Sequence, residues 1–129
     1  MKRFKHWQKP TFDETGMTKW NWMCQYSENL EIGKQSDIGA FTYINAKYGV
    51  VIETEVQIGS HCAIYSDNTM DGNKGRVVIK KGAKIGSHTV ILPGVTIGER
   101  AVVGAKSLVK KDVAAGAVVA GVTAKPLKK

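Results

Sequence analysis

Residues 79–109 read IKKGAK IGSHTV ILPGVT IGERAV VGAKSL V, with an aliphatic residue at every sixth position. A glycine follows this residue in several hexads, and a small or β-branched residue lies four positions after it. The rule extends backwards along the chain, and the aliphatic positions are Ile32, Ile38, Ile44, Ile52, Ile58, Ile64, Ile79, Ile85, Ile91, Ile97, Val103 and Val109. This regularity indicates an internal six-residue repeat.

A period of six decides the fold class. An α-helix turns by about 600° over six residues, so it cannot keep the aliphatic positions on one face. Short strands separated by corners can, and three hexads then close one triangular coil. The sequence therefore predicts an all-β protein, a parallel β-helix with a continuous aliphatic column inside. The glycines after the aliphatic positions are expected where backbone lies close to a corner.

The repeat is interrupted twice. Eight positions instead of six separate Ile44 from Ile52, and fifteen separate Ile64 from Ile79. The second interruption predicts an excursion loop over residues 66–78, whose Asp, Asn and Gly content is typical of a loop. A loop that leaves a regular solenoid commonly has a function on one face.

The chain before the repeat has a different character. Residues 1–29 form an N-terminal segment, and residues 30–127 form the β-helix domain with a short C-terminal segment. We expect residues 1–18 to be loosely ordered. Trp20, Trp22, Cys24 and Tyr26 alternate along the segment 19–26, which predicts one aromatic face of a capping strand over the open end of the solenoid. Sugar stacking on a tryptophan is the alternative.

Composition sets the remaining limits. The chain has 129 residues and a net charge of +8, which indicates one domain with an anion-attracting surface. No nucleic-acid recognition motif is present, and no stretch has the apolar length of a membrane span or the pattern of a signal peptide. We expect a cytoplasmic protein with no nucleic-acid or membrane partner, and free thiols at Cys24 and Cys62.

The hexapeptide rule and the segment 82–129, GAKIGSHTVILPGVTIGERAVVGAKSLVKKDVAAGAVVAGVTAKPLKK, resemble the left-handed β-helix acyltransferases. The likeness is greatest to the sugar and xenobiotic O-acetyltransferases of the galactoside and maltose type and to short sugar N-acetyltransferases. It implies a left-handed coil, acetyl-CoA as co-substrate without a metal, and a homotrimer with active sites between subunits. It also implies a sugar acceptor, nucleotide-linked if the product is a surface polysaccharide, and transfer to a hydroxyl or an amine.

The resemblance assigns residues to the cofactor side of the cleft. They line the pantetheine tunnel or approach the phosphates and nucleotide, and are Gly86, Ser87, Gly104, Ala105, Lys110, Lys111 and Lys125. Basic side chains and backbone N–H groups suit phosphate. Lys106 departs from the family, which usually has a glycine there.

The candidate general bases are histidines. Galactoside-type enzymes carry a catalytic histidine in the excursion loop, and this loop has none. His61 and His88 each lie three positions after an aliphatic residue, so a loop that returns to the same face stacks them in a column Phe41–His61–His88–Lys106. The family also has a histidine at the position of His88, which makes His61 the preferred base. His88, an acidic loop residue (Asp67 or Asp71), or no protein base are the alternatives.

The acceptor is expected to contact the excursion loop and the shorter insertion, through Asn45, Lys47, Ser66, Asp67, Asn68, Asp71 and Asn73. Carboxylate and carboxamide groups suit sugar hydroxyls or a protonated amine, and a lysine suits a diphosphate.

Two other functions compete with acetyl transfer. One is a metalloenzyme like the γ-class carbonic anhydrases, which need two histidines at five-residue spacing and a third across the interface. No H-x-x-x-x-H occurs here. The other is a non-catalytic β-helix scaffold whose tunnel is blocked by Lys106.

Overall fold

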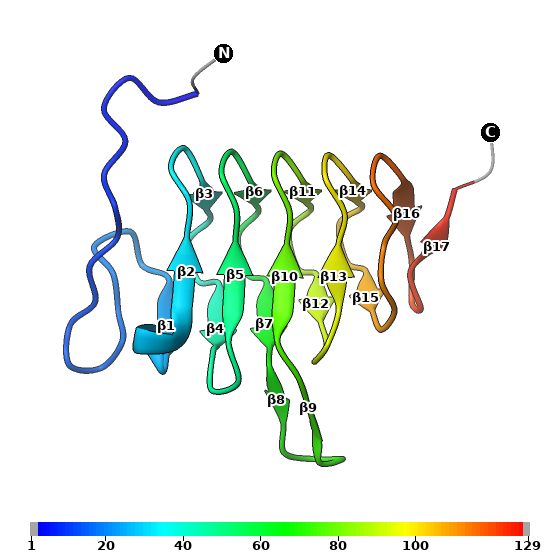
Figure 1. Cartoon of the computed structure of the whole chain (residues 1–129), viewed down its shortest axis with the longest axis horizontal. Helices are drawn as coiled ribbons and strands as arrows, with labels where there is room; N and C mark the ends of the chain where they lie inside the picture. The colour runs from blue at the N-terminus through cyan, green and yellow to red at the C-terminus, as the bar shows by residue number, and fades with distance from the viewer. Residues whose placement is uncertain (1–2, 128–129) are drawn as a thin grey trace.

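The structure is a computed structural model, and it describes residues 3–127. The chain winds into a left-handed parallel β-helix with three faces, as predicted (Figure 1). Sheet A contains β1 (Met23–Gln25), β4 (Tyr43–Asn45), β7 (Ala63–Tyr65), β12 (Val90–Ile91) and β15 (Leu108–Val109). Sheet B contains β2 (Leu30–Ile32), β5 (Val50–Ile52), β10 (Val77–Ile79) and β13 (Thr96–Ile97).

Sheet C forms the third face. It contains β3 (Asp37–Ile38), β6 (Gln57–Ile58), β11 (Lys84–Ile85), β14 (Val102–Val103), β16 (Val118–Ala120) and the antiparallel edge strand β17 (Lys125–Pro126). A short 3₁₀ helix, η1 (Ser27–Asn29), connects β1 to β2. The excursion is a hairpin of β8 (Asp67–Asn68) and β9 (Asn73–Lys74) that projects from the solenoid (Figure 1).

The register across the excursion keeps every aliphatic column intact. Ile79 pairs with Ile52, and Ile85 pairs with Ile58. The hairpin therefore leaves and rejoins the same face, as the predicted column of histidines requires. The hairpin is shorter than the expected loop 66–78, because residues 77 and 78 already belong to β10.

The interior is filled by the repeat itself. Ile44, Ile64 and Ile91 of sheet A are fully buried and stack on one another along the axis. The other two faces bury equivalent residues, so each coil packs mainly against its neighbours, as expected for a solenoid.

Glycines and corner residues have separate functions. A Cβ atom on Gly86 would lie 2.5 Å from the backbone nitrogen of Ala105, so the glycine is required by the close approach of the next coil. In the adjacent corner, larger residues adopt the left-handed backbone conformation, with φ of 58° at His61 and 59° at His88. Because the φ > 0 position is outside the core, its side chain points outward and is free to vary.

The N-terminal segment differs from the prediction. Only residues 23–25 form a strand, so Trp22 and Cys24 are buried while Trp20 is 39% exposed and Tyr26 is 45% exposed in a left-handed turn. The four side chains therefore do not share one face.

The expected loose order of residues 1–18 is also wrong for the described part. The guanidinium of Arg3 bonds the Asp37 carboxylate at 2.8 Å. The backbone of Phe4 exchanges two hydrogen bonds with the Gln35 side chain. We call residues 3–22 the N-terminal arm.

Candidate functional site

A column of aromatic side chains marks the corner between sheets C and A. The rings of His61 and His88 are stacked with centroids 4.8 Å apart and planes 2° from parallel. Phe41 continues the column on one side, 5.1 Å from His61, and Lys106 follows His88 in the next coil. All four residues have φ between 58° and 66°. We call this set the histidine column.

Backbone hydrogen bonds hold the column in register. The N–H of His61 donates to Ala40 O, and that of His88 donates to Ser60 O, each at 3.0 Å. The N–H of Lys106 donates to Ser87 O at 2.9 Å. The stacking of the two imidazoles is therefore a consequence of coil geometry.

Ser60 is a neighbour of His61 that sequence reasoning missed. Its Oγ lies 3.1 Å from His61 Nδ1. When Nδ1–H donates to this hydroxyl, Nε2 is the proton acceptor. The repeated letters "IGSH" contained this signal, because each histidine follows a serine directly. Both histidines are exposed, so a substrate can reach them.

A groove of about 380 Å³ runs beside the column on sheet C. Its floor is backbone, since Gly59, Gly86 and Gly104 line it together with Ala105. Arg3 and Lys84 lie at its rim, and sequence reasoning missed both. Lys84 alternates with the buried Ile85 in β11, so it faces outward. Three of the predicted cofactor residues thus share one groove, and Ser87 lies between Gly86 and His88.

The predicted phosphate-binding lysines lie outside this groove. Lys110 and Lys111 directly follow β15, at the end of the sheet A strands that lies away from the histidine column, and both are exposed. Lys125 is exposed in β17, at the C-terminal edge of sheet C. The segment of Lys125 is bonded to the start of β15, because the N–H of the preceding Ala124 donates to Leu108 O at 2.8 Å.

The hairpin and the shorter insertion 46–49 emerge at the corner between sheets A and B. Two cations approach the ring of Tyr48: the Nζ of Lys47 lies 5.6 Å and that of Lys74 lies 5.5 Å from its centroid. The side chains of Asp67, Asn68, Asp71 and Asn73 are on the hairpin. Because the histidine column is at the other end of the sheet A strands, one chain does not join the hairpin to the histidines.

Ser66 has a different role from its predicted one. It is fully buried, its hydroxyl donates to Asn45 O at 2.8 Å, and it accepts from the Tyr48 N–H at 3.0 Å. Ser66 therefore ties the two insertions together instead of facing an acceptor.

The outer face of sheet A between these two corners carries tyrosines that sequence reasoning missed. Tyr43 donates to Gln25 Oε1 at 2.6 Å, and its ring lies 5.6 Å from that of Tyr65. Asn45 donates to the Tyr43 hydroxyl at 3.4 Å. Burial raises the pKa of Tyr43 above its ordinary value of 10.0, so this hydroxyl is a neutral donor. In β4 and β7 the residues on either side of the buried isoleucine face outward, and this alternation could have identified the two tyrosines from the sequence.

Within residues 3–127 no group of three or more His, Cys, Asp or Glu side chains is arranged to hold a metal ion. In the same range no helix has the length and apolar character needed to cross a membrane. Cys24 and Cys62 are unpaired and buried, and burial raises the pKa of both thiols.

Comparison with known proteins finds similar sequences among transferases. A family model described as bacterial transferase hexapeptide (six repeats) matches residues 76–111. The galactoside O-acetyltransferase of Escherichia coli K12 is 33% identical over 112 residues, which cover 75% of this chain and 52% of that protein. The chain thus spans about half the length of this curated relative.

Solved structures show the same fold. The hexapeptide-repeat-containing acetyltransferase VCA0836 of Vibrio cholerae, complexed with acetyl coenzyme A, superposes with a TM-score of 0.78 at 28% identity. The match covers 83% of this chain and 63% of that one. A galactoside acetyltransferase in complex with coenzyme A gives a TM-score of 0.75 at 29% identity, over 84% and 58% of the two chains.

Proposed function

Because the chain belongs to the hexapeptide-repeat transferase family, we propose that it transfers an acetyl group from acetyl-CoA to a hydroxyl or amine of a sugar. The observation that carries this proposal is the juxtaposition of a backbone-floored groove and a pair of exposed imidazoles at one corner. A narrow acyl donor and a proton acceptor must meet at such a place for acyl transfer.

The groove fits the donor. Gly86, Gly104 and Ala105 leave room for a thin chain such as pantetheine to lie against the backbone, and Ser87 adds a hydroxyl at the corner. The cations Arg3 and Lys84 at the rim suit the donor's phosphates. In our proposal Lys110, Lys111 and Lys125 approach the nucleotide from a neighbouring subunit.

His61 fits the general base. The acceptor hydroxyl or amine attacks the thioester carbonyl carbon, and its proton passes to the imidazole of His61. When the tetrahedral intermediate collapses, the carbon–sulfur bond breaks and the same proton passes to the leaving thiolate. His88, whose ring stacks on that of His61 with centroids 4.8 Å apart, is the alternative base.

The acceptor site is proposed to form in a homotrimer. The hairpin residues Asp67, Asn68, Asp71 and Asn73, with Asn45 and Lys47, lie too far along sheet A to serve the histidines of their own chain. A site between subunits places the hairpin of one chain beside the column of the next. The galactoside acetyltransferases among the relatives favour a sugar, free or nucleotide-linked, and we propose that the enzyme acts in the cytoplasm.

A coenzyme A release assay tests the proposal. Acetyl-CoA is supplied with free sugars and nucleotide-linked amino sugars, and His61→Ala and His88→Ala are measured beside the wild type. We expect His61→Ala to lower kcat by about 10²–10⁴-fold, the usual contribution of a general base. Loss confined to His88→Ala would overturn the assignment of the base.

Calorimetry separates the enzyme from a scaffold. Acetyl-CoA is expected to bind the wild type and both histidine variants, because the groove is independent of the imidazoles. No heat of binding at millimolar acetyl-CoA would contradict the proposed function as a whole.

A further inference from the structure

Phe41, at one end of the histidine column, has no part in the chemistry described so far. Its ring is 65% exposed, although its centroid lies only 5.1 Å from that of His61. Its backbone has a φ of 66°, a conformation that is uncommon for a residue with a bulky side chain. The fold does not require a phenyl ring here, because the corner lies outside the core and asparagine or glycine would fit this backbone with less strain. The residue therefore points to a function outside the fold.

A polar residue of the N-terminal arm continues the corner beyond Phe41. Asn21 lies one coil earlier at the same corner, since Met23 pairs with Tyr43 and the φ of Asn21 is 65°. The N–H of Phe41 donates to the carbonyl oxygen of Asn21 at 2.6 Å, and the side chain of Asn21 is exposed. Along this corner, the phenyl ring thus follows a carboxamide and precedes an imidazole.

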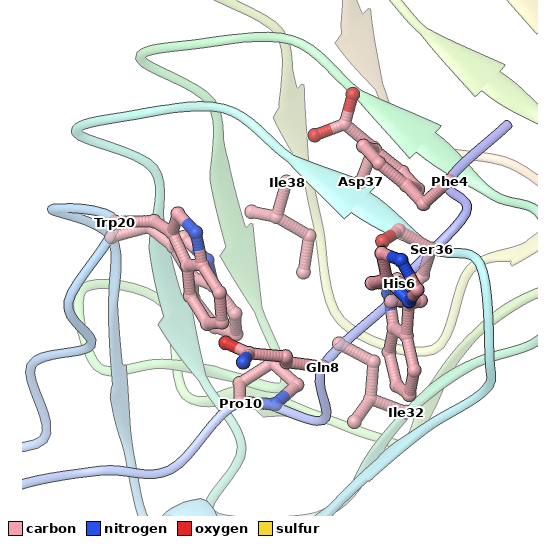
Figure 2. Close-up of a pocket in the computed structure, with 11 residues that line it drawn as sticks. Phe4, His6, Gln8, Pro10, Trp20, Ile32, Ser36, Asp37 and Ile38 are labelled. Carbon is pink, nitrogen blue, oxygen red and sulfur yellow. The ribbon is translucent and has the colours of Figure 1, made fainter.

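The arm anchors Asn21 at this corner. The N–H of Asn21 donates to Thr18 O at 3.2 Å, and the next residue, Trp22, is 2% exposed in the core. The preceding residue, Trp20, lines a cavity of about 260 Å³ where the arm packs against the first coil (Figure 2). The carboxamide is therefore presented by a segment with defined contacts on the coil.

The proposed donor groove lies beside the imidazoles and stops short of Phe41. Its three floor glycines each lie two positions before a residue of the column, as Gly59 does before His61. Gly39 has the same place before Phe41, and it does not line the groove. The glycine floor thus ends at the coil of His61, and a donor lying on it leaves the ring of Phe41 open to a second substrate.

We propose that Phe41 is the platform on which the acceptor sugar lies, with one C–H face of the pyranose ring against the phenyl ring. This contact leaves the hydroxyls at the edge of the sugar, where Asn21 bonds one and Nε2 of His61 accepts the proton of another hydroxyl or of an amine. The inference rests on the proposed function and names its acceptor class: a pyranose with an apolar C–H face.

Other occupants match the corner less well. A purely apolar partner would cover Phe41 and strip water from Asn21 and His61 without giving them hydrogen-bonding partners. A ringless alcohol or amine would meet the imidazole but gain nothing from the phenyl ring. A pyranose is apolar on its face and polar at its edge, which is the order of the side chains along this corner.

Phe41→Asn is the variant that tests the platform, because asparagine tolerates the left-handed backbone and lacks the ring. Acetyl transfer is followed by coenzyme A release with methyl β-D-galactopyranoside, methyl β-D-glucopyranoside, D-glucosamine and UDP-N-acetyl-D-glucosamine. We expect KM for the sugar to rise about 3–10-fold with kcat nearly unchanged, since stacking stabilises the ground state and the transition state alike. The thermal midpoint is expected to stay at or above that of the wild type.

Two further variants serve as controls. Phe41→Trp keeps an aromatic platform and should keep KM at or below the wild-type value. Tyr26→Ala is the matched control, because Tyr26 is also an exposed aromatic residue with a left-handed backbone, 45% exposed with a φ of 59°, but lies after β1 at another corner. Its loss should leave KM unchanged.

Saturation-transfer difference NMR supplies a readout that needs no turnover. The C–H protons of the same four probes are expected to take up saturation from the wild type and from Tyr26→Ala, and far less from Phe41→Asn.

The outcomes separate the platform from the proposed function. The platform is overturned if Phe41→Asn keeps the wild-type KM and saturation transfer, or if it lowers kcat at unchanged KM, which would make Phe41 a positioning residue for His61. It is also overturned if the variant changes the oligomeric state in analytical ultracentrifugation, which would make the ring a subunit contact. In these cases turnover by the wild type leaves the proposed function standing. Saturation transfer that depends on Phe41 without acetyl transfer to any probe would contradict the proposed function and retain the platform, and neither signal with any probe would overturn both.

Discussion

The regular coils and the N-terminal arm build their concave surfaces in opposite ways. In the coils, the groove is open at Gly86 and Gly104 because these residues have no side chain. The backbone of the next coil packs directly against Gly86. In the arm, Trp7 and Trp20 enclose a pocket by adding large side chains around one another. A repeat therefore sets positions and spacing, whereas an irregular segment sets shape. The next four predictions compare the two regions, from the largest expected effect to the smallest.

The largest effect is expected from the interior of the coils. Ile64→Ala should lower the free energy of unfolding by about 2–5 kcal/mol, because Ile64 is fully buried between equivalent isoleucines above and below. Chemical denaturation measures this value. A loss below about 1 kcal/mol would mean that adjacent coils relax into the cavity.

The glycine groove should be next in sensitivity. Gly86→Ala places a Cβ 2.5 Å from the Ala105 nitrogen, so the coils must separate, at a cost of about 1–3 kcal/mol. Acetyl-CoA affinity, measured by calorimetry, should fall as well. The control is Gly72→Ala at the hairpin tip, where nothing lies within 4 Å and only the positive φ is strained. Equal acetyl-CoA affinities in the two variants would argue against the groove as the donor site.

Alkaline pH should destabilise the fold through the buried thiol of Cys24 in β1. Burial raises the pKa of Cys24 from 9.0 to about 12. The folded state therefore holds its proton more tightly than the unfolded state, and the resulting stability is lost as pH rises from about 9 to about 12. Thermal midpoints of wild type and Cys24→Ala should converge over this range and run parallel below it. Parallel curves throughout would contradict the shift.

The smallest effect is expected at the start of the arm. Arg3→Ala removes the 2.8 Å contact with Asp37, which is half-exposed, so unfolding should change by about 1 kcal/mol or less. Tryptophan emission is the more sensitive measurement, because Arg3 anchors the chain just before Trp7. Unchanged emission would show that Trp7 holds the arm without this ion pair.

The same contrast explains what could be predicted from the sequence. The stacking of His61 on His88 followed from spacing alone, because the aliphatic residues fix the register of every coil. The arm obeys no repeat, and its order depends on tertiary contacts such as Trp7 with Ser36. Lys84 was missed because the hexapeptide rule marks inward positions and is silent about outward ones. Ser66 was misassigned because a polar residue beside a loop looks exposed until its two hydrogen bonds are seen.

Both insertions emerge at the corner between sheets A and B, and neither disturbs the register of the coils. New loop sequences can therefore be grafted at this corner without moving the histidines at the other. In the proposed enzyme, such grafts would change the residues that face the acceptor and leave the proposed base in place. For protein engineering, residues 67–74 are the cassette to exchange, with Ser66 retained as its anchor.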